Sequence, residues 1–203
     1  AGLFGAFSAA AGTPLGSDAV FDALFGAALE GEADAGGLLA YNHLAGEPIA
    51  GLEEGRPLVV RTPDSRLTLA NFMRAQLYGV FGTLALGMRV LAEEGVALDL
   101  MFAHGGMFRT AGVAQRFLAG ALAAPVAVGE TASEGGAWGI AVLAAYLGES
   151  DQFDLSTYLE RRVFAGAETS TAEPDADDVA GFAAYLERYR SGLAIEAAAV
   201  AAL

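Results

Sequence analysis

The 203-residue sequence predicts an α/β domain in which helices cover a mainly parallel β-sheet. The main observation is the run Leu98–Leu147, in which a strand, a glycine turn, a helix, a second strand and a second helix follow one another. Two further short apolar strands are predicted at 36–42 and 57–61, and a long helical pattern follows at 68–94. Strands that alternate with helices in this order are typical of sheets covered by helices.

The elements on either side of this run are predicted to be mostly helical. Residues 1–35 form a helical lead-in of two loosely amphipathic helices. The helix at 68–94 contains Gly79, Gly82 and Gly87, which lower helix propensity by about 1 kcal/mol each relative to Ala. We therefore expect these glycines to be needed for close packing of the helix on a sheet.

The C-terminal part, residues 148–203, is predicted to be an acidic helical extension of the same single domain, 1–203. It is irregular up to 174 apart from a short helix near 155–162. An amphipathic helix starts at Pro174–Asp175, ends near 189–192, and precedes a short Ala-rich tail. We interpret the acidic stretch Glu173–Asp178 as a solvated helix start, where acids favour the helix dipole.

Composition excludes several classes of function. Twenty-five acidic and eleven basic residues give a net charge of −14, which would repel a phosphate backbone, so no nucleic-acid partner is expected. The chain has no Cys, which excludes a thiolate nucleophile and a zinc–thiolate site. Every basic residue is Arg, so a Lys Schiff base and a Walker A loop are also excluded. The longest apolar run, 117–128, is shorter than the roughly 20 residues of a membrane span, so no membrane partner is expected.

The best candidate for a binding site is the segment that follows the predicted strand Leu98–Ala103. Its residues are His104, Gly105, Gly106, Met107, Phe108 and Arg109. Ligands of open α/β sheets bind beyond the carboxyl ends of strands. Two glycines there let the backbone approach a ligand, and free N–H groups at the start of the helix expected from Thr110 favour an anion. The segment therefore indicates a nucleotide or phosphate site, although two glycines can also simply make a tight turn.

A second glycine-rich segment, Glu134–Gly139, starts the next predicted helix, which runs to about Leu147. Thr131 and Glu134 match a capping box. The simplest interpretation is that small residues let this helix pack on the sheet, with Trp138 as a core or interface side chain.

A third candidate follows the first predicted strand, where Asn42, His43 and Glu47 are polar groups that a substrate could approach. His43 and His104 are the only histidines, and both follow strands. No carboxylate frame accompanies them and no nucleophile elbow is present, so we expect no metal site, and a catalytic role of either histidine has little support.

Taken together, four segments resemble the C-terminal domain of the FGGY carbohydrate kinases, and most closely the xylulokinase and ribulokinase branch. They are GGLLAYNHLAGEP, RAQLYGVFGTL, HGGMFRTAGVAQRFLAGALAAPVAV and EGGAWGIAVLAAY, which agree with the family in order and spacing over 36–146. The resemblance implies an RNase H-like (actin-like ATPase) fold, with a central mixed sheet flanked by helices. It also implies that ATP, with Mg²⁺, phosphorylates a hydroxyl of a pentulose sugar.

The resemblance further assigns residues and partners. Gly105, Gly106, Met107, Phe108 and Arg109 would bind the adenosine and α-phosphate end of ATP, with Met107 and Phe108 bulkier than the family's usual residues. The helix that starts at 135 would belong to the hinge between two domains. The family's catalytic Asp, first phosphate loop and most sugar contacts have no counterpart here. We therefore expect the chain to be inactive alone, and its own N-terminal kinase domain to be its partner.

The sequence is also compatible with other functions. The chain could be a non-catalytic interaction module that keeps the actin-like fold for assembly, and a homodimer is possible. A hydrolase that uses His43 or His104 is a weaker alternative. A cytoplasmic location is compatible with the cysteine-free composition.

Overall fold

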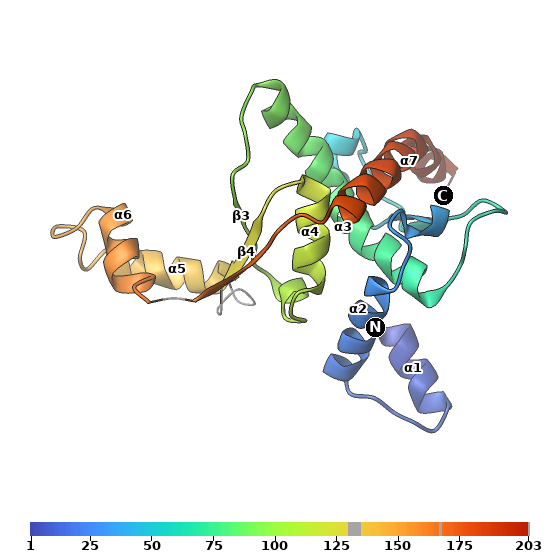
Figure 1. Cartoon of the computed structure of the whole chain (residues 1–203), viewed down its shortest axis with the longest axis horizontal. Helices are drawn as coiled ribbons and strands as arrows, with labels where there is room; N and C mark the ends of the chain where they lie inside the picture. The colour runs from blue at the N-terminus through green and yellow to red at the C-terminus, as the bar shows by residue number, and fades with distance from the viewer. Residues whose placement is uncertain (130–134, 167, 203) are drawn as a thin grey trace.

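The computed structural model describes residues 1–129, 135–166 and 168–202 (Figure 1). The helices are α1 (Gly2–Ala10), α2 (Ser17–Leu29), α3 (Leu69–Glu93), α4 (Val113–Leu122), α5 (Gly135–Tyr146), α6 (Leu155–Tyr158) and α7 (Ala176–Ala202). The strands are β1 (Leu39–Tyr41), β2 (Leu58–Val60), β3 (Met101–Phe102), β4 (Val126–Gly129) and β5 (Thr169–Ala172). The predicted lead-in is thus formed by α1 and α2. Treating 1–203 as a single domain stays a prediction.

The described strands form two small sheets, and the expectation of a mainly parallel sheet is wrong. β1 pairs antiparallel with β2. In the other sheet, of order β3-β4-β5, β4 is parallel to β3 and antiparallel to β5. The predicted β–α–β–α run is confirmed for β3, α4, β4 and α5. The sequence reasoning missed β5, because the alternating polar residues of TSTA cover only four positions in an acidic, irregular stretch.

Helix α3 lies at the centre of the molecule, and its glycines are sites of close packing, although only Gly79 packs against a strand as expected. A Cβ atom at Gly79 would lie 2.5 Å from the carbonyl oxygen of Ala40 in β1. A Cβ atom at Gly82 would lie 2.9 Å from the ring of Tyr189 in α7. By length and composition α3 could also cross a membrane, but it packs against β1, α2, α4 and α7, as the core helix of a globular domain does.

A buried ion pair joins α3 to α7. Arg74 and Asp178 are both 2 % exposed, and the Arg74 guanidinium donates to the Asp178 carboxylate. Arg116 in α4 donates to the other oxygen of Asp178 at 2.6 Å, and this bond raises the pKa of the Arg116 guanidinium. The interpretation of the whole stretch Glu173–Asp178 as solvated is therefore wrong at Asp178. Its carboxylate is buried because two arginines compensate for the lost hydration.

Helix α7 is longer than expected and carries a row of buried aromatic side chains. It continues without a break to Ala202, so the predicted end near 189–192 and the separate tail are wrong. Phe182, Tyr185 and Tyr189 lie on one face at helical spacing, and adjacent rings stack at 6.1 and 6.0 Å. Tyr41 of β1 packs on Tyr189 and donates to its carbonyl oxygen at 2.8 Å. Burial raises the pKa of the Tyr185 and Tyr189 hydroxyls, which keeps them neutral as hydrogen-bonding groups in the core.

Helix α5 does not pack on a sheet, contrary to expectation. None of its residues is buried, and Ile140 is 70 % exposed. Figure 1 shows α5 and α6 projecting from the body formed by α3, α4 and α7. Trp138 is half-buried and packs on Phe164 with 5.6 Å between ring centroids, so it fills a local contact. The predicted capping box of Thr131 and Glu134 lies outside the described residues.

We predict that Asp178→Ala destabilises the fold by about 3–5 kcal/mol, because it leaves the buried Arg74 cation without its counter-charge. Urea unfolding monitored by far-UV circular dichroism measures the change. The matched control is Asp177→Ala, which removes an exposed acid from the same helical turn. The control is expected to cost less than about 0.5 kcal/mol. An equal decrease in the free energy of unfolding for the two variants would contradict a stabilising role of the buried ion pair.

Candidate nucleotide-binding site

The segment Gly105–Arg109 leaves the end of β3 and turns sharply. Gly105 has φ +121°, a conformation that L side chains rarely adopt, and Gly106–Phe108 then form a short 3₁₀ turn. The helix expected from Thr110 begins only at Val113, behind Gly112 with φ +77°. The amides nearest the candidate site therefore belong to the 3₁₀ turn and not to the N-terminus of α4.

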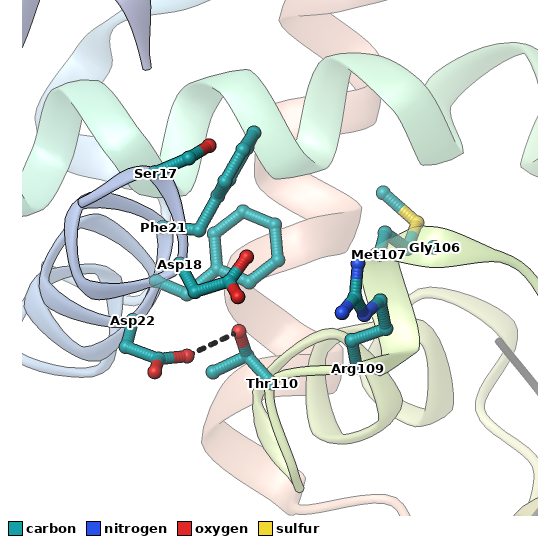
Figure 2. A pocket seen from close by; sticks show the side chains of 9 residues that line it. Ser17, Asp18, Phe21, Asp22, Gly106, Met107, Arg109 and Thr110 are labelled. Carbon is teal, nitrogen blue, oxygen red and sulfur yellow. Dashed lines mark hydrogen bonds between the residues drawn. The ribbon is translucent and has the colours of Figure 1, made fainter. Parts of the chain in front are cut away.

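This turn forms one wall of a cavity of about 580 Å³. The cavity residues on this side are Gly106, Met107, Arg109 and Thr110. A Cβ atom at Gly106 would meet nothing within 4 Å, so the backbone here faces open space. Arg109 extends its guanidinium into this space (Figure 2). Among the described residues, Arg109 forms no salt bridge, so its charge is available to an anion.

The opposite wall is helix α2, which the sequence reasoning did not place near the site. It contributes Ser17, Asp18, Phe21, Asp22 and Phe25, which share one helical face (Figure 2). Thr110 donates to the Asp22 carboxylate at 2.9 Å and so joins the two walls. The bonded residues are 88 positions apart in the sequence. Their helical spacing shows in the sequence that they share one face of α2, but it does not show which part of the chain this face lies against.

The two glycine-rich motifs of the sequence lie next to each other in the structure. A Cβ atom at Gly135, the first residue of α5, would lie 2.6 Å from Cγ of His104. His104 is exposed and immediately precedes Gly105. A side chain at Gly135 would therefore overlap His104, next to the Gly105–Gly106 turn, whereas a Cβ at Gly136 would meet nothing within 4 Å.

Asn42, His43 and Glu47 do not line the cavity and instead make local contacts beyond β1. The amide of Asn42 donates to the Gln76 carbonyl oxygen at 3.1 Å. The Glu47 carboxylate accepts from the Ile49 amide at 3.1 Å. Nε2 of His43 lies 3.1 Å from the Tyr189 hydroxyl, which is also 3.2 Å from the Thr83 hydroxyl. These contacts hold the loop against α3 and α7, and their assignment to a substrate cleft stays a prediction.

Within residues 1–129, 135–166 and 168–202, no group of three or more His, Asp or Glu side chains could hold a metal ion. Of the two histidines, His43 is hydrogen-bonded to Tyr189 and His104 adjoins Gly135.

Comparison with known proteins places this architecture in a family. Residues 4–148 match the model of the C-terminal domain of the FGGY family of carbohydrate kinases. The chain therefore belongs to this family, and it has the actin-like ATPase fold of the solved sugar kinases that it resembles. A search of curated protein sequences found no match.

Solved structures show the same fold at low sequence identity. Xylulose kinase from Rhodospirillum rubrum is 23 % identical, with a TM-score of 0.63 over 88 % of this chain and 34 % of that one. Gluconate kinase from Lactobacillus acidophilus is 20 % identical, with a TM-score of 0.63 over 84 % of this chain and 34 % of that one. Glycerol kinase from Plasmodium falciparum, solved with ADP, is 16 % identical, with a TM-score of 0.58 over 85 % and 32 %. The chain thus spans about a third of the length of each kinase.

We predict that Gly135→Ala moves the binding turn, because the new methyl group would overlap the His104 ring. The expected result is a shift of the His104 imidazole resonances together with the amide resonances of Gly105 and Gly106, measured by NMR. Gly136→Ala is the matched control, since its methyl group enters open space and Ala favours a helix by about 1 kcal/mol over Gly. Unchanged His104 resonances in Gly135→Ala would contradict the close approach of the two motifs.

Proposed function

We propose that this chain is the ATP-binding half of a sugar kinase, which transfers the γ-phosphate of ATP to a hydroxyl of a pentulose. The observation that carries the proposal is the cavity of about 580 Å³ beside the Gly105–Gly106 turn in a chain of this family. Pockets of about 300–1,000 Å³ are typical of small-molecule sites.

The two sides of the turn suit different parts of ATP. The exposed backbone of Gly106 offers N–H donors to the α-phosphate. The guanidinium of Arg109, which forms no salt bridge with the residues that the structure describes, offers it positive charge. Met107 and the rings of Phe21 and Phe25 offer apolar surface to the adenosine. Phe108 lies outside the cavity lining and packs against the core, so its role is to hold the turn in place.

A magnesium ion is expected to reach the cleft on the phosphates of ATP. Protein sites commonly hold Mg²⁺ by one or two carboxylates together with substrate phosphates. In the described part of this chain, the acids near the cavity do not form a set of three that could hold the ion alone. This chain would therefore bind the nucleotide, and the remaining metal ligands would come from the rest of the kinase.

The proposed partner is an N-terminal kinase domain of the same protein. Phosphoryl transfer requires the nucleophile, phosphates and metal to be positioned together, and one half of the catalytic cleft between two domains does not achieve this. The apolar, exposed helix α5 begins beside the nucleotide turn and is suited to pack against such a domain. The chain alone is expected to bind ATP weakly and to transfer no phosphate.

We predict that ATP shifts the amide NMR resonances of Gly105, Gly106 and Arg109 in the isolated chain. Arg109→Ala should weaken binding about tenfold, because a charge-assisted hydrogen bond to phosphate contributes roughly 1.5–3 kcal/mol. Arg61→Ala is the control, since Arg61 is exposed, lies outside the cavity and forms no salt bridge among the described residues. Shifts that cluster elsewhere, or equal effects of the two variants, would contradict the assignment.

A second prediction concerns the sugar. A protein in which this chain follows an N-terminal kinase domain should phosphorylate xylulose or ribulose with a higher kcat/KM than gluconate or glycerol. A coupled assay of ADP release measures all four, and the 203-residue chain alone serves as the inactive control. A preference for gluconate or glycerol would exclude a pentulose kinase but retain a sugar kinase.

The second candidate function is a non-catalytic interaction module. The observation that favours it is α5, which has no buried residue and exposes Ile140 and Leu143, as a helix that binds another protein does. The ATP titration separates the two candidates, because a module need not retain a nucleotide site. Self-association in analytical ultracentrifugation without ATP binding would support the module.

A further inference from the structure

The nucleotide cavity has walls of opposite charge. Helix α2 contributes the carboxylates of Asp18 and Asp22, and the turn after β3 contributes the guanidinium of Arg109 (Figure 2). Phosphates are repelled by the first wall and attracted by the second. A nucleotide that places its phosphates at Arg109 therefore directs its base or ribose toward α2.

The two acids of α2 are not equivalent. Asp22 already accepts the hydrogen bond from Thr110 that joins the walls, which fixes the orientation of its carboxylate. Asp18 forms no salt bridge with any residue that the structure describes, and its carboxylate extends into the cavity. Asp18 is thus the acid whose oxygens are available to a ligand.

An ionised carboxylate only accepts hydrogen bonds, so its partner on a nucleotide must be a donor. On a nucleobase, carboxylates accept from exocyclic amino groups. A carbonyl oxygen at the same position would place two acceptors against each other, which is unfavourable. Asp18 can therefore distinguish bases by the group that they present to α2.

We infer that Asp18 is a specificity-determining residue that accepts a hydrogen bond from the exocyclic amino group of adenine. Asp22 acts as a positioning residue, because its bond to Thr110 sets the separation of the two walls. This inference rests on the proposed ATP site and adds how that site selects its base. It concerns the α2 wall, whereas the phosphate contacts lie on the opposite wall.

The test compares the affinities of nucleotides that differ only in the exocyclic amino group of the base or in the 2′-hydroxyl of the ribose. Amide-shift titrations of the 203-residue chain give apparent affinities for ATP, for purine riboside triphosphate, which lacks the amino group, and for 2′-deoxy-ATP. The unmodified chain should prefer ATP over purine riboside triphosphate about fivefold, as a partly solvated hydrogen bond to a charged group allows. Asp18→Ala should abolish this preference, and the control Asp177→Ala should keep it.

A conservative variant of Asp18 tests its hydrogen bonding to the base separately from any effect on folding. Asp18→Asn keeps the size of the side chain and adds a donor, so it should improve binding of inosine triphosphate, which carries a carbonyl where adenine has its amino group. A merely structural role for Asp18 would not change this ratio. Far-UV circular dichroism of each variant confirms that α2 is retained.

The outcomes separate this inference from the proposed function. If ATP shifts no resonance near Gly105, both are overturned. If ATP binds there but Asp18→Ala leaves the preference for the amino group intact, only the role of Asp18 is overturned. The inference would also be overturned if the unmodified chain bound 2′-deoxy-ATP more weakly than ATP but bound purine riboside triphosphate as tightly as ATP. This result would assign Asp18 to the 2′-hydroxyl of the ribose.

Discussion

The architecture of this domain depends on the buried ion pair between Arg74 and Asp178. Arg74 also donates to the Tyr78 hydroxyl at 3.0 Å and to the Gly31 carbonyl oxygen at 2.9 Å, just beyond the end of α2. Its guanidinium lies 4.6 Å from the ring centroid of Phe117 in α4. One cation thus contacts or bridges four helices: α2, α3, α4 and α7. Burying it is favourable only because Asp178 and these acceptors replace its hydration.

This constraint reaches the candidate site through α2 and α4. The cavity lies between α2 and the turn that leads into α4, so its width follows from how these two helices are held. Arg74 fixes the end of α2 on the core, and Thr110 fixes its first half to the turn. The polar contacts that stabilise the fold therefore also set the geometry in which a nucleotide would be bound.

Helix α5 differs from the other long helices because its apolar residues are not buried in the core. The helix is apolar but exposed. Among the residues that the structure describes, it approaches His104 at Gly135 and packs on 153–164 through Trp138 and Tyr146. Apolar surface of this kind is stabilised when another surface covers it. Helix α5 has such a surface in a chain that spans about a third of its solved relatives' length.

The sequence by itself determined the family, the described helices and four of the five strands that the structure describes, because apolar periodicity and glycine motifs are local signals. It also identified the Gly105–Gly106 turn. The tertiary structure decided what faces that turn, because Asp18 and Asp22 are distant in sequence and ordinary in their local pattern. It likewise decided that Asp178 is buried while Asp177 beside it is solvated. The physical reason is that the environment of a charge depends on which helices pack around it, and local spacing does not encode that packing.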